Sequence, residues 1–228
     1  MFSKSKLDQV LPDFVTYLSS KNCIEDYLLY EVQKAWSDHW DIEAVRLTET
    51  YESALQSQIS QRLWRSSDYE PKEMMLRFLN HDKEMVRIMF RDLFNEAKPI
   101  DLRIQRFSYH CDELFTAYRK ANPNQKLRSH YHDHRMISLY LLLNNPIKYL
   151  FFDENHFVTS MQKLGARNFN SPVVTESYYK IGAILGKFLN ENETLSNALK
   201  KRLTERRIKM SKGNAIVNIF ITWLGNSK

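Results

Sequence analysis

Glycine is scarce in this chain, and that scarcity limits which folds the chain can adopt. Only five of its 228 residues are glycine, against about 7% in average proteins. A Rossmann fingerprint, a Walker A loop, a collagen repeat and a turn-rich β-sandwich all need more glycine than this. Long helices joined by short connections need little, so the composition favours an all-α fold.

Apolar residues recur at spacings of three and four along most of the chain, which is typical of amphipathic helices. This pattern predicts helices over residues 7–18, 24–36, 41–63, 71–98, 101–121, 130–143, 157–164, 171–189 and 194–213. Two further stretches leave a β alternative open. Residues 148–152 are short and aromatic, and periodicity does not decide whether 216–224 is a helix or a buried strand. We predict a mainly helical protein, with a small β-hairpin or short strands near 148–152 and 216–224 as the alternative.

No internal repeat or low-complexity linker divides the chain. Its length suits one large domain or two small ones. We expect a single helical module over residues 1–228. A loosely separate N-terminal part, residues 1–66, ahead of a main part, residues 67–228, is the second possibility.

The sequence also bears on compartment. No run reaches the roughly 18 apolar residues of a membrane span, and residues 1–6 lack the apolar core of a signal peptide. Cys23 and Cys111 lie far apart without metal-ligand spacing, as expected of reduced thiols. We predict a cytoplasmic protein with no membrane partner.

Positive charge is concentrated near the C-terminal end. Residues 1–186 hold 24 Lys and Arg against 24 Asp and Glu, whereas residues 187–228 hold 9 against 3. Such asymmetry is typical of a contact surface for a polyanion, although a solvated helix face is the plain alternative. The nucleic-acid-binding candidates are Lys200, Lys201, Arg202, Arg206, Arg207, Lys209 and Lys212. On a continuous helix, Leu199, Leu203 and Ile208 would anchor the core side and leave Arg202, Arg206 and Lys209 free.

One polar cluster raises the question of a metal. His130, His132, Asp133 and His134 offer the ligand types that suit zinc. On a helix, however, only His130 and His134 share a face, and structural zinc normally takes four ligands. We therefore predict no metal site, with His130 and His134 as the weak candidates, and interpret the cluster as a capped helix start.

Motifs for catalysis are lacking. The stretch from Gly182 to Lys187 is one residue short of a P-loop and lies in a helical pattern, so Gly182 and Gly186 are better explained by close helix packing. The acid-x-Lys triplets at 70–72 and 96–98 follow no apolar strand, as a nuclease would require. We predict a protein that is not an enzyme and has no cofactor.

Five strings stand out between about residues 60 and 165: 72–78 (KEMMLRF), 86–96 (VRIMFRDLFNE), 106–114 (RFSYHCDEL), 130–141 (HYHDHRMISLYL) and 146–152 (PIKYLFF). This set resembles the N-terminal region of bacterial McrB-like AAA-family ATPases. In such restriction machines, that region is a target-recognition module ahead of a nucleotide-driven motor, which recruits a separate nuclease. The present chain has no Walker A or Walker B context, so the resemblance does not imply nucleotide hydrolysis here.

The resemblance and the charge together predict a non-catalytic recognition module. It would bind DNA, with modified DNA as one candidate ligand, in a McrB-like restriction or defence system that includes an AAA-family ATPase domain or a nuclease subunit. Rings such as Trp36, Trp40, Trp64 and Tyr69 can stack on a base or fill a core. The alternatives are a protein-interaction or oligomerisation domain that positions such a partner, and a metal-dependent enzyme centred on residues 130–134.

Overall fold

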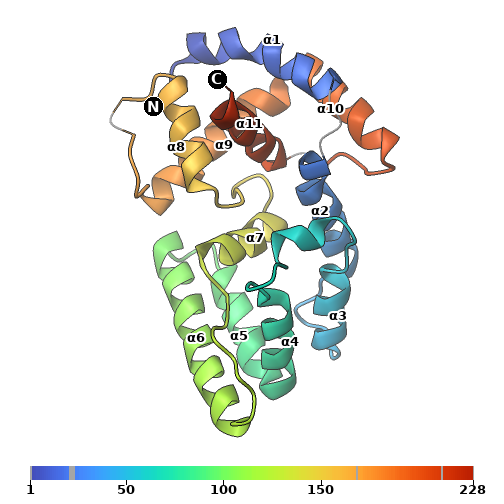
Figure 1. The fold of residues 1–228 in the computed structure, drawn as a ribbon, viewed down its shortest axis with the longest axis vertical. Helices are drawn as coiled ribbons and strands as arrows, with labels where there is room; N and C mark the ends of the chain where they lie inside the picture. Colours follow the sequence, from blue (N-terminus) through green and yellow to red (C-terminus); the bar gives the residue numbers. More distant parts are fainter. Residues whose placement is uncertain (1, 21–23, 168, 212, 228) are drawn as a thin grey trace. The chain divides into compact units, whose positions relative to one another are not determined.

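The computed structural model describes residues 2–20, 24–167, 169–211 and 213–227. Within these ranges the chain forms eleven α-helices and no strand, which confirms the all-α fold (Figure 1). The helices are α1 (Lys4–Ser20), α2 (Leu28–His39), α3 (Leu47–Ala54), α4 (Pro71–His81), α5 (Lys83–Leu93), α6 (Ile100–Ala121), α7 (His134–Asn144), α8 (Glu154–Lys163), α9 (Thr175–Glu191), α10 (Glu193–Glu205) and α11 (Ala215–Asn226). Across the described ranges, none of these helices is long and apolar enough to cross a bilayer.

The helices belong to two compact units. Unit 1 combines residues 1–30 with residues 145–228, and unit 2 comprises residues 31–144. The chain therefore first passes from unit 1 to unit 2 inside α2, between residues 30 and 31. The boundary between residues 66 and 67, which the sequence left open, lies within unit 2.

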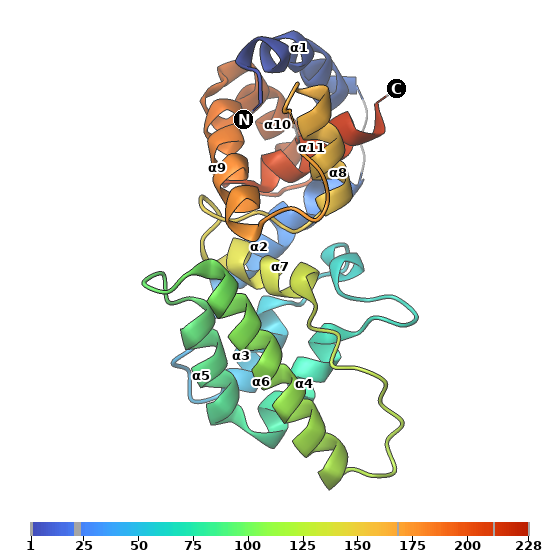
Figure 2. The ribbon, with the colours of Figure 1, turned by 90° about the vertical axis from the view of Figure 1, so that its left-hand side faces the viewer.

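Unit 1 is organised around α11, a helix without a charged residue. It packs against α8 and α9, while α10 packs against α9 and α1 (Figures 1 and 2). Phe14 of α1 reaches this core, where its ring lies 5.1 Å from the rings of both Phe220 and Trp223. Every side chain from Ala215 to Ile221 is buried, which explains why a mostly apolar sequence forms a helix here.

Residues 148–152 do not form the strand that their composition suggests. The segment begins in a turn, where the amides of Lys148 and Tyr149 donate to Asn145 O, and continues without regular secondary structure. Other backbone groups along it bond to side-chain amides of unit 1 instead of a neighbouring strand. Asn214, at the N-cap of α11, donates from Nδ2 to the carbonyls of Ile147 and Tyr149, at 2.8 and 3.2 Å. The strand alternative is wrong at residues 148–152, and also at 216–224, which belong to α11.

Close contact with this segment also explains two glycines of α9. A Cβ on Gly182 would lie 1.9 Å from Leu150 Cδ1, and a Cβ on Gly186 would lie 2.0 Å from Asn214 Oδ1. Glycine is therefore needed at both positions for close packing, which confirms the interpretation of the P-loop-like stretch.

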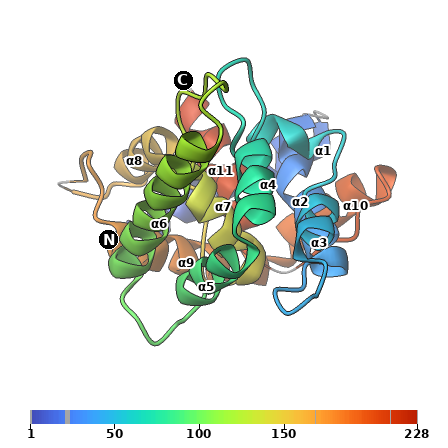
Figure 3. The same cartoon turned by 90° about the horizontal axis from the view of Figure 1, so that it is seen from below.

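Unit 2 contains α3 to α7, with α5 and α6 packed together and α4 against α3, α5 and α6 (Figures 1 and 3). Phe90 lies at the centre of its core. The Phe90 ring centroid is 4.9 Å from that of Tyr140, 5.1 Å from Trp40 and 5.2 Å from Phe107. Trp36 stacks on Trp40 at 4.5 Å, so these rings serve the core.

Two long helices predicted in unit 2 are shorter than expected. Residues 71–98 form α4 and α5, because Asp82 ends the first helix and caps the second by accepting from the Met85 amide at 2.9 Å. Residues 41–63 form only α3 and a short 3-10 helix, Ser60–Leu63. Asp41 instead makes a local turn by accepting from the Glu43 amide.

Candidate anion-binding surface and buried histidine cluster

The basic segment of unit 1 begins on α10. Asn192 caps this helix by accepting from the Leu195 amide at 3.0 Å, two residues before residue 194, where the predicted helix begins. Leu199 and Leu203 are fully buried, which confirms them as the anchors of the helix.

The helix ends at Glu205, well before Gly213. The amide of Arg207 donates to Thr204 O, and that of Ile208 to Leu203 O, the two hydrogen bonds of a Schellman motif. Arg207 holds the left-handed position of this motif, at φ 57°, where glycine is usual. Because no glycine marks this end, periodicity alone predicted a helix that is eight residues too long.

The structure divides the predicted basic residues into two kinds. The side chains of Lys200, Lys201, Arg206, Arg207 and Lys209 are exposed, the first two on α10 and the others beyond its end. Arg202 is only 4% exposed, so its expected place on a free face is wrong. Lys212 lies outside the described residues.

Arg202 is buried because it has an acidic partner far away in sequence. Its Nη1 lies 2.9 Å from Asp26 Oδ2, and Asp26 also accepts from the Tyr17 hydroxyl at 3.0 Å. Burial raises the pKa of the Asp26 carboxyl, while Arg202 and Tyr17 act in the opposite direction. The rings of Tyr17 and Tyr27 lie 5.3 and 5.8 Å from the guanidinium carbon, within cation–π range.

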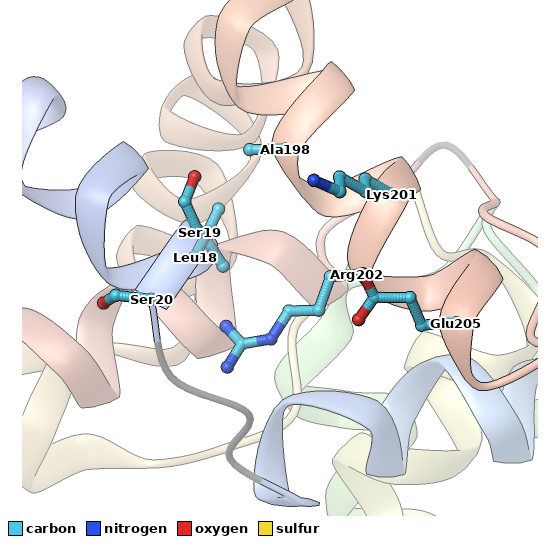
Figure 4. A pocket seen from close by; sticks show the side chains of 7 residues that line it. All are labelled: Leu18, Ser19, Ser20, Ala198, Lys201, Arg202 and Glu205. Carbon is cyan, nitrogen blue, oxygen red and sulfur yellow. The ribbon is translucent and has the colours of Figure 1, made fainter.

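A pocket of about 240 Å³ opens between the C-terminal end of α1 and α10 (Figure 4). Ser19 and Ser20 of α1 line it from one helix, and Lys201, Arg202 and Glu205 from the other. In the part of the chain that the structure describes, all three guanidinium nitrogens of Arg202 lack a hydrogen-bond partner, and Nη1 is paired with Asp26 by charge. Buried donors without an acceptor cost about 1–3 kcal/mol each. These nitrogens have almost no accessible surface, so Arg202 lines the pocket without presenting a free donor to it.

The two units differ in charge. Unit 1 holds 16 Lys and Arg against 10 Asp and Glu, whereas unit 2 holds 17 of each. The whole net charge of +6 therefore belongs to unit 1, the unit that carries the pocket and the exposed cations.

In unit 2, the histidines come together with a residue that spacing did not indicate. Cys111 of α6, His130 and His132 place one potential ligand atom each within 4.8 Å of the others, and Cys111 and His132 are buried. His134 is not a member of this group. Cys111 is 19 residues from His130 in sequence, so only the approach of α6 to the loop before α7 reveals the cluster.

The hydrogen bonds of the two imidazoles compete with a metal ion. His130 Nδ1 accepts from the His132 amide at 2.9 Å, which leaves the proton on Nε2, 3.2 Å from Asp112 Oδ1. His132 Nδ1 donates to His130 O at 2.7 Å, and its Nε2 accepts from the Tyr140 hydroxyl at 3.2 Å. In this tautomer His130 has no lone pair free for a metal.

Two pKa shifts agree with a neutral, structural cluster. Burial lowers the pKa of His132 to about 3, assisted by His130. Burial also raises the pKa of the Cys111 thiol, although a metal needs the thiolate. Asp133, which the metal hypothesis included, caps α7 by accepting from the Met136 amide at 2.9 Å, as the capped-start interpretation requires.

The chain is thus an all-α protein with two units, a basic surface on one and a buried His-Cys cluster in the other. No family model, no curated protein and no solved structure that was compared with the chain matches it.

Proposed function

We propose that this protein is a non-catalytic recognition module that binds nucleic acid, with DNA as the first candidate, through the basic surface of unit 1. We define this basic surface as Lys200, Lys201, Arg206, Arg207 and Lys209. One observation carries the proposal. Unit 1 holds all the net charge, and five of its exposed cations lie in one stretch of ten residues, 200–209. Such a surface neutralises phosphates regardless of base sequence.

The resemblance to McrB-like ATPases supports the same function and adds a division of labour. Four of its five strings lie in unit 2 and only residues 146–152 lie in unit 1. We propose that unit 1 contacts the phosphate backbone and that unit 2 faces an AAA-family ATPase or nuclease partner. Readout of a modified base within this proposal requires rings other than Trp36 and Trp40, because these two are used in the core.

A specific observation favours protein contact as the second candidate function. Three large apolar side chains of unit 2 are exposed on α5 and α6: Ile88 at 54%, Leu102 at 42% and Tyr109 at 58%. Exposed apolar side chains on adjacent helices are typical of protein–protein contacts.

The test is the salt dependence of DNA binding. The parent protein should bind a duplex at low salt, and the Lys200→Gln, Arg206→Gln, Lys209→Gln triple variant should flatten the slope of log affinity against log salt by about two to three. None of these three residues lines the pocket. A matched control replaces Lys120, Lys126 and Arg128, three exposed cations of unit 2, and should leave the slope unchanged.

Two results would contradict the proposal. If the triple variant and the parent show the same slope of log affinity against log salt, the basic surface does not contact DNA and is only exposed to solvent. If the parent binds no DNA at low salt, protein contact becomes the first candidate, and Ile88→Lys or Tyr109→Lys should then weaken self-association or partner binding.

A further inference from the structure

We infer that α10 enters the major groove of duplex DNA and that Asn197, at the centre of its exposed face, reads an adenine there. The inference rests on the proposed function for the class of ligand and adds the mode of recognition. Contacts from the basic surface to phosphates carry no sequence information. An amide side chain on the same helix can distinguish one base pair from another.

One face of α10 is fixed to the rest of unit 1. Leu195, Leu199 and Leu203 are fully buried, and Arg202 on the same side is paired with Asp26. At about 100° per residue, these four positions of α10 span an arc of about 100° on the helix. A helix anchored in this way presents its opposite face in one orientation, which the reading of base edges requires.

The opposite face of α10 carries uncharged hydrogen-bonding groups between two cations. Asn197 lies nearly opposite the centre of the buried arc, and Thr204 lies about 20° from Asn197, two helical turns further along. Lys200 and Lys201 lie on the two sides of this line, and all four side chains are exposed. Among the described residues, the Asn197 amide has no hydrogen-bond partner and neither lysine has an acidic partner.

These residue types fit the major groove. An α-helix with its side chains is about 10–12 Å across, and the groove is about 12 Å wide. Adenine presents a donor at N6 and an acceptor at N7 on this edge, so Asn197 can accept through Oδ1 and donate through Nδ2 at the same time. Lys200 and Lys201 then face the phosphates on the two sides of the groove. The Thr204 hydroxyl already donates to Lys200 O at 2.8 Å, which leaves its methyl group for contact with a thymine methyl.

Two carboxylates of α10 restrict how DNA docks. Glu193 lies in the first turn, and Glu205 is the last residue of the helix, where it lines the pocket beside α1 (Figure 4). Both repel phosphates. The part of the helix that faces the groove is therefore the part between them, from Asn197 to Thr204.

Selection from a pool of DNA duplexes with a randomised core tests the inference on the full chain at low salt. The parent should enrich an adenine at one position by about fivefold or more, the discrimination of one bidentate pair. Asn197→Ala should abolish this preference and keep the slope of log affinity against log salt, because the amide neutralises no phosphate. Asn124→Ala, at an exposed asparagine of unit 2, is the matched control and should keep both. Both positions are exposed, so both variants should remain folded, which circular dichroism verifies.

A change in the base tests the same contact without a change in the protein. The analogue 7-deazaadenine pairs as adenine does but has carbon in place of the N7 acceptor. At the selected position it should weaken binding by the parent about fivefold or more. It should leave binding by Asn197→Ala unchanged, because that variant has no amide to lose a partner.

Failure of this inference differs from failure of the proposed function. If the parent binds DNA with a steep salt slope but enriches no adenine, α10 does not read bases and the proposed function stands. The same conclusion follows if Asn197→Ala keeps the preference, or if 7-deazaadenine weakens binding by the parent and by Asn197→Ala equally. If the parent binds no DNA at low salt, the proposed function fails and this inference fails with it.

Discussion

Asn218 of α11 hydrogen-bonds both backbone polar groups of Phe151. Its Nδ2 donates to the Phe151 carbonyl at 2.7 Å, and its Oδ1 accepts from the Phe151 amide at 3.2 Å. Four residues earlier, at the N-cap of the same helix, Asn214 donates to the carbonyls of Ile147 and Tyr149. Together, Asn214 at the N-cap and Asn218 in the first turn of α11 satisfy backbone groups of this segment that no strand pairs with.

Removing this amide should destabilise unit 1. Asn218→Ala leaves a buried amide and weakens the bonding of a buried carbonyl, so we expect a loss of about 2–3 kcal/mol in the free energy of unfolding. Urea denaturation followed by circular dichroism measures it. Asn197→Ala, at an exposed position of α10, is the control and should change stability by no more than about 0.5 kcal/mol. Equal stabilities of the two variants would contradict the role of Asn218.

Gly186→Ala should destabilise the protein even though alanine is the better helix former by about 1 kcal/mol. The new Cβ would lie 2.0 Å from Asn214 Oδ1 and would displace an amide that bonds two carbonyls. We expect a net loss of about 2 kcal/mol or more. In an Asn214→Ala background the cost should shrink or reverse, because the atom that clashes is gone, and a thermal-melting double-mutant cycle measures the coupling. Additive effects would show that the contact is not the cause.

Arg207→Gly should stabilise unit 1 although it removes a side chain. Arg207 has φ 57°, a conformation that costs most residues about 1–2 kcal/mol and glycine almost nothing. We expect a gain of about 0.5–1 kcal/mol in thermal or urea unfolding. Arg206→Gly removes the same charge at φ −99° and should destabilise instead. A gain in both variants would point to charge repulsion as the cause.

Burial of His132 should make stability depend on pH. Its pKa is about 3 in the folded protein and about 6.5 when unfolded, so the unfolded state binds the extra proton between these values. Stability from this group is complete well above pH 6.5 and falls as the pH decreases, by about 2.3 kcal/mol between pH 6.5 and 4.5.

Unfolding free energies measured across that range check the prediction. His132→Gln should flatten the dependence by about one proton, whatever its effect on stability at neutral pH. His81→Gln, at an exposed position of the same unit, should leave the dependence as in the parent. An unchanged slope in His132→Gln would mean that the imidazole is not neutral in the fold.

Local features of the sequence were sufficient for several results. Periodicity predicted the all-α fold and the buried faces of Leu199 and Leu203. Pro71 begins α4 as expected, because proline suits the first helical turn. The helix predicted to end at residue 164 ends at Lys163, followed by Gly165 at φ 78°, with the amide of Ala166 bonded to Met161 O. In each case the physical cause lies within about one helical turn of the residue.

Other results depended on partners distant in sequence. Nothing near Arg202 predicts Asp26, which lies 176 residues away and draws a cation of the basic segment into the interior. Nothing near His130 predicts Cys111, and nothing near Phe151 predicts Asn218. A sequence determines which residues prefer a helix and which prefer burial, because these preferences arise from each residue and its near neighbours. Which charge is neutralised and which backbone group is satisfied was decided only by the tertiary structure, because those interactions require groups that approach each other only when the chain folds.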